Sequence, residues 1–78
     1  MEELVKYIVN TLVENKDAAS VTLTETEKET IINVKVAKED MGKVIGRHGK
    51  IAESIRSIVK TAASGSGKRY FVKFDEAE

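Results

Sequence analysis

The spacing of the apolar residues changes along this 78-residue chain from a helical period to a strand period and back again. In residues 2–14 the apolar side chains fall on one face of a helix. Residues 20–25 and 30–37 instead alternate apolar and polar side chains and are rich in β-branched residues, which predicts two strands. A polar, charged segment joins them, so we expect an antiparallel hairpin.

The second half of the chain repeats this change of period. Residues 38–45 predict a short helix, and residues 50–63 predict a longer one with one apolar face. A glycine- and serine-rich turn at 64–67 ends that helix. Residues 68–74 alternate again and predict a last strand.

The order helix, strand, strand, helix, helix, strand predicts a mixed α+β (α/β) fold in one domain over residues 1–78. Residues 1–37 would form the first helix and the hairpin, 38–63 the helical pair, and 64–78 the last strand with a frayed acidic tail at 75–78. Three helices on one face of a three-stranded sheet would bury every apolar stripe. Those stripes include Leu4, Val5, Val21, Leu23, Ile32, Val34, Val36, Ile51, Ile55, Ile58, Val59, Ala62, Tyr70, Val72 and Phe74. The open face would carry Thr22, Thr24, Ile31, Asn33, Lys35, Arg69, Phe71 and Lys73.

Composition narrows the class of protein. Cysteine is absent, so neither a disulfide framework nor a thiolate metal site is expected. The longest apolar runs are only a few residues, too short to predict a membrane-spanning helix, and we expect no membrane partner. A domain this small has little room for an enclosed substrate cavity. These features favour a cytoplasmic binding module and lower the expectation of an enzyme.

The charge is unevenly distributed, although 13 basic and 13 acidic side chains give a formal net charge of zero. Residues 1–37 hold four basic and seven acidic side chains, and residues 74–78 hold three acidic ones. Residues 38–73 hold nine basic and three acidic side chains, a local net charge of +6. A basic region of this kind favours binding to a polyanion such as nucleic acid. The alternative, which we weight equally, is that these side chains are only the solvated faces of two helices.

The most informative segment is the glycine loop, which we define as residues 46–49, between the two predicted helices. Gly46 would end the first helix with a positive φ, and Gly49 would let a foreign backbone approach closely. The first amides of the second helix, near Gly49 and Lys50, carry the positive end of its dipole, so phosphate oxygens suit this place.

Basic and apolar side chains around the glycine loop complete a candidate nucleic-acid site. Arg47, Lys50, Lys43 and His48 would add charge and donors, while Ile45, Ile51 and Val36 would form an apolar groove under bases. The predicted binding residues are Lys43, Ile45, Gly46, Arg47, His48, Gly49, Lys50 and Ile51.

Catalytic and metal-binding alternatives are weaker. His48 is the only histidine and has no cysteine beside it, so no metal or other cofactor is expected. A Ser–His–Asp arrangement is compatible with the composition, but no nucleophile-elbow motif accompanies it. The segment 65–69 lacks the first glycine and the final Ser or Thr of a phosphate-binding P-loop.

The segment Val44-Ile45-Gly46-Arg47-His48-Gly49-Lys50-Ile51 resembles the signature of KH domains. In that family the glycine loop clamps the backbone of about four single-stranded nucleotides. The extra helix and strand before the strand–helix–helix–strand core resemble the type II, bacterial arrangement.

Over nearly its whole length the sequence is similar to the small bacterial KhpA family, on the segments Glu3–Val9 and Ala37–Gly46. The resemblance implies a cytoplasmic RNA-binding protein and RNA chaperone linked to cell elongation and division. It also implies self-association and pairing with a larger KH-containing partner of the Jag/KhpB type. Lys38 stands where many relatives have proline, and the Arg47-His48 pair is variable in the family.

Two other binding hypotheses stay open. Phe71, flanked by Arg69 and Lys73, would stack a base on the open sheet face, although edge packing or a partner contact is favoured about three to one. The domain would otherwise be chiefly a dimerisation module that uses the second helix of the pair. Its small apolar residues Ile55, Ile58, Ala62 and Ala63 would serve that interface.

Overall fold

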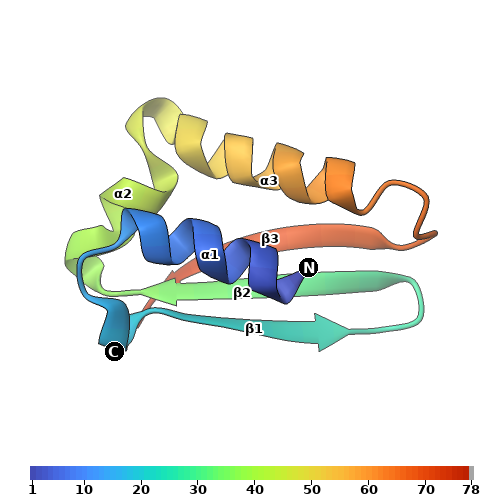
Figure 1. The fold of residues 1–78 in the computed structure, drawn as a ribbon, viewed down its shortest axis with the longest axis horizontal. Coiled ribbons are helices and arrows are strands. Elements are labelled where there is room, and N and C mark those ends of the chain that lie inside the picture. Colours follow the sequence, from blue (N-terminus) through green and yellow to red (C-terminus); the bar gives the residue numbers. More distant parts are fainter. Residues whose placement is uncertain (78) are drawn as a thin grey trace.

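A computed structural model describes residues 1–77 of the chain (Figure 1). The elements are α1 (Glu2–Leu12), β1 (Ser20–Glu25), β2 (Glu29–Val36), α2 (Met41–Ile45), α3 (Lys50–Ala62) and β3 (Arg69–Glu76). Short 3-10 turns occupy Lys16–Ala18, Lys38–Asp40 and Arg47–Gly49. This order confirms the predicted α+β class.

The three strands lie in the order β1-β2-β3, so β2 is central. β1 and β2 are antiparallel, with Val21 opposite Val34, which confirms the predicted hairpin. β2 and β3 are parallel, with Ile32 opposite Val72. Parallel neighbours need a crossover connection on one face of the sheet, and α2 and α3 provide it.

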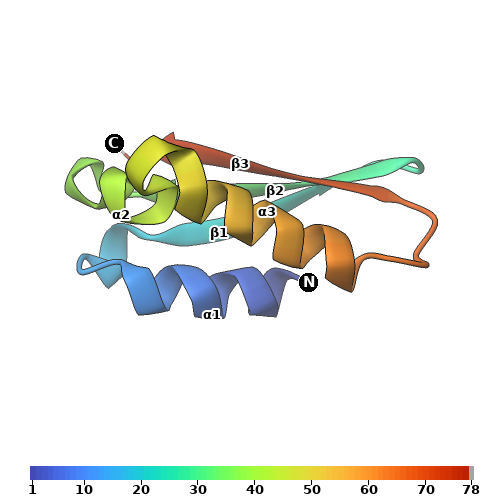
Figure 2. The same ribbon diagram turned by 90° about the horizontal axis from the view of Figure 1, so that it is seen from above.

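One hydrophobic cluster draws on every helix and strand. Figure 2 shows α1 and α3 on the same side of the sheet. The buried members of the cluster are Val5, Val9, Val13, Val21, Ile32, Val34, Val36, Val44, Ile55, Val59 and Val72. The opposite face carries exposed or half-buried residues at the alternate positions, as predicted, Phe71 among them.

The prediction that the fold buries every apolar stripe is wrong at four positions. Leu4, Leu23, Ile58 and Ala62 are exposed. On α3, Ile55 and Val59 are buried, and Ile58 lies about 100° around the helix from Val59, so it turns away from the sheet. Ala62 is the last residue of α3. Leu23 lies near the end of β1 that reaches past the first turn of α1 (Figure 1).

Two segments are more ordered than expected. The polar segment that follows the helix predicted at 2–14 forms a 3-10 turn at Lys16–Ala18, and the Asn15 side chain accepts a hydrogen bond from the Ala18 amide at 3.3 Å. The predicted frayed tail begins inside β3, which runs on to Glu76, and the Ala77 amide donates to the Val36 carbonyl at 2.7 Å. Glu78, the last residue of that predicted tail, lies outside the described residues.

Candidate nucleic-acid interface

The glycine loop begins where α2 ends, because the backbone reverses at Gly46. The Gly46 amide donates to the Gly42 carbonyl at 2.9 Å, and its φ of +77° lies in the region that favours glycine. A Cβ on Gly46 would lie 2.5 Å from Cγ1 of Ile51. Glycine at 46 therefore lets the first turn of α3 pack directly on the end of α2.

His48 and Gly49 continue the reversal in the left-handed region. Their φ values are +57° and +72°, and Gly49 is the N-terminal cap of α3. Histidine is one of the few side chains enriched in this region, whereas glycine enters it without steric cost. A Cβ on Gly49 would meet open space, so this position leaves room for a foreign backbone.

The amides expected to hold phosphate are already used inside the loop. The Gly49 amide donates to the Gly46 carbonyl at 3.2 Å, and the Lys50 amide donates to the Arg47 carbonyl. This part of the prediction needs revision, because the tight turn itself consumes those donors. Attraction for a phosphate at this point therefore falls mainly to side chains and to the α3 dipole.

The side chains around the loop separate into exposed and half-buried groups. Arg47, His48 and Lys50 are exposed at the turn. Ile45 and Ile51 are half-buried and pack against the core cluster, so each also presents apolar surface. Val36 is 0% exposed, so its predicted place in an apolar groove is wrong: it faces the helices from the central strand.

Lys43 differs from the other predicted cations because it is already paired. Its Nζ lies 2.8 Å from Oε1 of Glu14 and 3.5 Å from Oδ1 of Asp40. The hydrogen bond to the Glu14 carboxylate raises the pKa of Lys43, against a smaller opposing effect of burial. Lys43 therefore lies beside the candidate site with its charge largely compensated.

Asp40 is the residue near the site whose role sequence reasoning missed. It is 0% exposed, and its two carboxylate oxygens accept hydrogen bonds from the Glu14 amide at 3.2 Å and the Asn15 amide at 3.0 Å. The hydrogen bond from Asn15 lowers the pKa of Asp40, helped by Glu14 and Lys43 and opposed by burial. Asp40 thus joins the end of α1 to the start of α2, which carries the glycine loop.

Arg56, further along α3 from the glycine loop, connects this helix to β3. Its Nε donates to the Val72 carbonyl at 3.3 Å, and its guanidinium lies 5.4 Å from the centre of the Phe74 ring. The helical pattern gives no sign of these contacts, because the partner strand lies 16 residues further along.

Two other kinds of feature are absent from residues 1–77. No group of three or more His, Cys, Asp or Glu side chains there is arranged to hold a metal ion. Within the same residues, no helix has the length and apolar character needed to cross a membrane.

The element order and the glycine loop between two helices define a KH domain of type II topology. The chain belongs to the family described as "KhpA/KhpB, KH domain", which matches residues 2–74. This confirms the predicted family. A KH domain is a binding fold, and this supports the prediction that the protein is not an enzyme.

Several curated relatives are similar over most of the chain, and each carries the name RNA-binding protein KhpA. The one from Caldanaerobacter subterraneus subsp. tengcongensis is 51% identical over 73 residues, which cover 94% of this chain and 97% of the relative. The one from Clostridium acetobutylicum is 42% identical with the same coverage. The one from Treponema pallidum is 42% identical over 69 residues, 88% of this chain and 86% of the relative.

Proposed function

We propose that this protein binds single-stranded RNA at the glycine loop, without covalent chemistry. The observation that carries the proposal is the juxtaposition at one turn of exposed Arg47, His48 and Lys50 with half-buried Ile45 and Ile51. Cations attract phosphates and the isoleucines offer a surface for bases, which is how KH domains hold about four nucleotides. The relatives are named RNA-binding proteins, which supports RNA as the ligand.

Within this proposed site we assign the residues different roles. Gly46 and Gly49 set the path of the backbone, and Arg47, His48 and Lys50 supply the attraction. Lys43 contributes less, because Glu14 and Asp40 compete for it. We expect modest affinity and little sequence preference from one domain of zero net charge.

The experiment that tests this proposal reverses charge at the loop. In the variant Arg47→Asp/His48→Asp, fluorescence anisotropy with a labelled single-stranded RNA should show loss of binding, because phosphate then meets carboxylates. The fold should survive, since aspartate tolerates the left-handed conformation at position 48. Circular dichroism checks this.

A matched control changes the same formal charge elsewhere. Lys28→Asp/Asn10→Asp alters exposed positions, and the hairpin turn that holds Lys28 lies at the opposite end of the molecule from the glycine loop (Figure 1). Binding should be nearly unchanged in the control. Undiminished RNA binding by the folded loop variant would rule out the glycine loop as the site. Single-stranded DNA of the same sequence is run in parallel, because no group here is assigned to a 2′-hydroxyl.

The family resemblance extends the proposal beyond the domain. We propose that the protein is cytoplasmic, acts as an RNA chaperone, and has a role in cell elongation and division. We also propose that it forms a homodimer and pairs with a larger Jag/KhpB-type protein. The family description names KhpA and KhpB together, which supports that partner.

A second candidate function is that of a dimerisation module with little RNA binding of its own. The exposed outer face of α3 favours it, since Ile58 is 44% exposed and lies beside Ala62 in a shallow, mostly apolar depression. Ile55 belongs to the core instead and is not available. Light scattering with and without RNA separates the candidates: a stable dimer that ignores RNA at low salt, and that Ile58→Asp dissociates, would favour this second function.

A further inference from the structure

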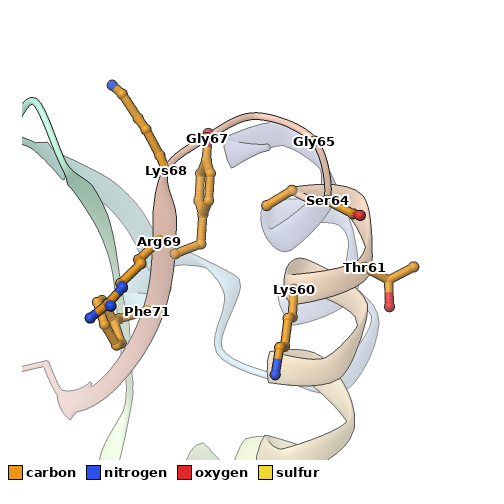
Figure 3. Close-up of a pocket in the computed structure, with 10 residues that line it drawn as sticks. Lys60, Thr61, Ser64, Gly65, Gly67, Lys68, Arg69 and Phe71 are labelled. Carbon is orange, nitrogen blue, oxygen red and sulfur yellow. The ribbon is translucent and has the colours of Figure 1, made fainter.

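A second basic region lies at the far end of α3 from the glycine loop. An open hollow of about 810 Å³ is bounded there by the last turns of α3, the following turn and the start of β3 (Figure 3). Lys60 lies on the α3 side, while Arg69 and Phe71 come from β3. None of the residues lining the hollow is acidic.

Both cations that matter here are available to a ligand. Lys60 and Arg69 are exposed, and within residues 1–77 neither forms an ion pair with a carboxylate. Phe71 is 47% exposed, so its ring is accessible to a ligand. Two uncompensated cations and an exposed aromatic ring around one strand match a ligand that carries both phosphates and planar bases.

The hollow extends around the free edge of the sheet. β3 is an edge strand, and Arg69 and Phe71 are two positions apart, so they share the open sheet face. Figure 3 shows Arg69 and Phe71 together on one side of β3, with Lys60 on the helix at the other side. A chain crossing this edge would therefore meet Lys60 first and then Arg69 and Phe71.

Lys68 lies on the same hollow but differs from these residues. Figure 3 shows its side chain extending away from Lys60 and Phe71. Its Nζ lies 4.0 Å from Oε1 of Glu25 on β1, so its charge is partly compensated. Lys68 therefore serves as a control for the charge of this region.

We propose that the hollow is a second contact for the same single-stranded nucleic acid that the glycine loop holds, with the backbone on Lys60 and Arg69 and a base stacked on Phe71. This inference rests on the proposed function. The two ends of α3 are about 20 Å apart for a helix of 13 residues, so a strand of four nucleotides centred on the loop extends only part of the way to the hollow. Longer strands gain this contact.

The test compares oligouridines of four and twelve nucleotides on the intact chain. In anisotropy titrations, Lys60→Gln/Arg69→Gln should weaken binding of the 12-mer about tenfold and lower its salt slope by about one to two. Phe71→Leu keeps the apolar bulk but removes the stacking ring, and should weaken the 12-mer about tenfold. Phe71→Tyr keeps a stacking ring and should bind the 12-mer as tightly as the unaltered protein does.

Two controls make the result specific. Lys68→Gln should leave 12-mer binding within about twofold of the unaltered protein. A 12-mer can also bind the loop in more registers than a 4-mer, which by itself raises its apparent affinity. That increase would be the same in every hollow variant, so it cannot explain a loss of 12-mer binding in those variants. NMR amide shifts at residues 69–71 should move with the 12-mer and stay still with the 4-mer, whereas the amides of Gly46 and Gly49 should move with both.

The outcomes separate this inference from the function on which it rests. If the loop variant loses both oligonucleotides while the hollow variants bind the 12-mer normally, the second contact is wrong and the glycine-loop site stands. If the unaltered protein binds neither oligonucleotide, both proposals fall. If Lys68→Gln weakens the 12-mer as much as Lys60→Gln/Arg69→Gln, general charge rather than this geometry is responsible, and the inference is also overturned.

Discussion

Two glycines bound the loop, but they meet different surroundings. Gly46 combines a φ of +77° with a contact that leaves no room for a Cβ, because Ile51 lies against it. Gly49 has a φ of +72° and open space around it. The first glycine is therefore required by both conformation and packing, and the second by conformation alone.

This difference predicts unequal costs of substitution. Gly46→Ala should lower the free energy of unfolding by roughly 3 kcal/mol, since it adds both backbone strain and overpacking against Ile51. Gly49→Asn should cost less than about 1 kcal/mol, because asparagine enters the left-handed region readily. Thermal and urea unfolding followed by circular dichroism measure both. Equal losses would contradict this interpretation of the loop.

The buried hydroxyl of Thr30 leads us to predict a stabilising substitution. It is 0% exposed in β2, and within residues 1–77 its Oγ1 has no hydrogen-bond partner. Thr30→Val keeps the β-branched shape and removes an unpaired buried hydroxyl, so it should raise the free energy of unfolding by about 1 kcal/mol. The melting temperature should rise by roughly 4–8 °C. The same change at exposed Thr22 is the control and should have little effect; a loss of stability in Thr30→Val would mean that the hydroxyl has a partner.

At the scale of elements, Asp40 holds the α1–β1 connection against the start of α2. Both of its carboxylate oxygens accept backbone amides, and asparagine can supply only one acceptor in the same place. Asp40→Asn should therefore lower the melting temperature by roughly 5–15 °C at neutral pH.

The effect of Asp40→Asn should depend on pH in a definite direction. The pKa of Asp40 is lowered in the folded protein from its usual 3.8, so its contribution to stability is present above that value and is lost as the pH falls through the lower, folded value. The gap in melting temperature between the unaltered protein and Asp40→Asn should be full at pH 7 and narrow below about pH 3.8. Exposed Asp17→Asn is the control for removal of one carboxylate. A gap that stays constant down to pH 2 would contradict the role given to Asp40.

Much of this element-scale description was predictable from the sequence, because it depends on the spacing of apolar residues and on the glycine and polar residues that end each element. The alternation in 20–25 and the glycine at 46 determine local structure through nearby residues alone. Asp40, Arg56 and Thr30 were not predictable, since their partners or surroundings come from segments far away in the chain. The exposure of Ile58 was missed for a related reason: an apolar stripe on a helix can be wider than the surface it covers.

At the scale of the whole molecule, zero net charge removes long-range steering but leaves local attraction. The candidate contacts at the glycine loop number about three, and each phosphate neutralised on a single strand contributes about −0.7 to the slope of log K against log salt. We therefore expect a slope of about −2 for a short RNA at the loop. Anisotropy titrations from low to physiological salt measure it. A slope near zero would show that phosphate contacts do not drive binding, and a slope beyond about −5 would require a much larger basic surface.

The parallel pairing of β2 with β3 has a consequence for how the domain is made. β2 is the central strand, yet one of its two neighbours is the last element of the fold, and about 40 residues separate the paired positions Ile32 and Val72. During synthesis, the hairpin and all three helices are made before that neighbour. One side of the central strand therefore stays unpaired until β3 has been added, so the sheet is completed late and through a contact of long sequence separation.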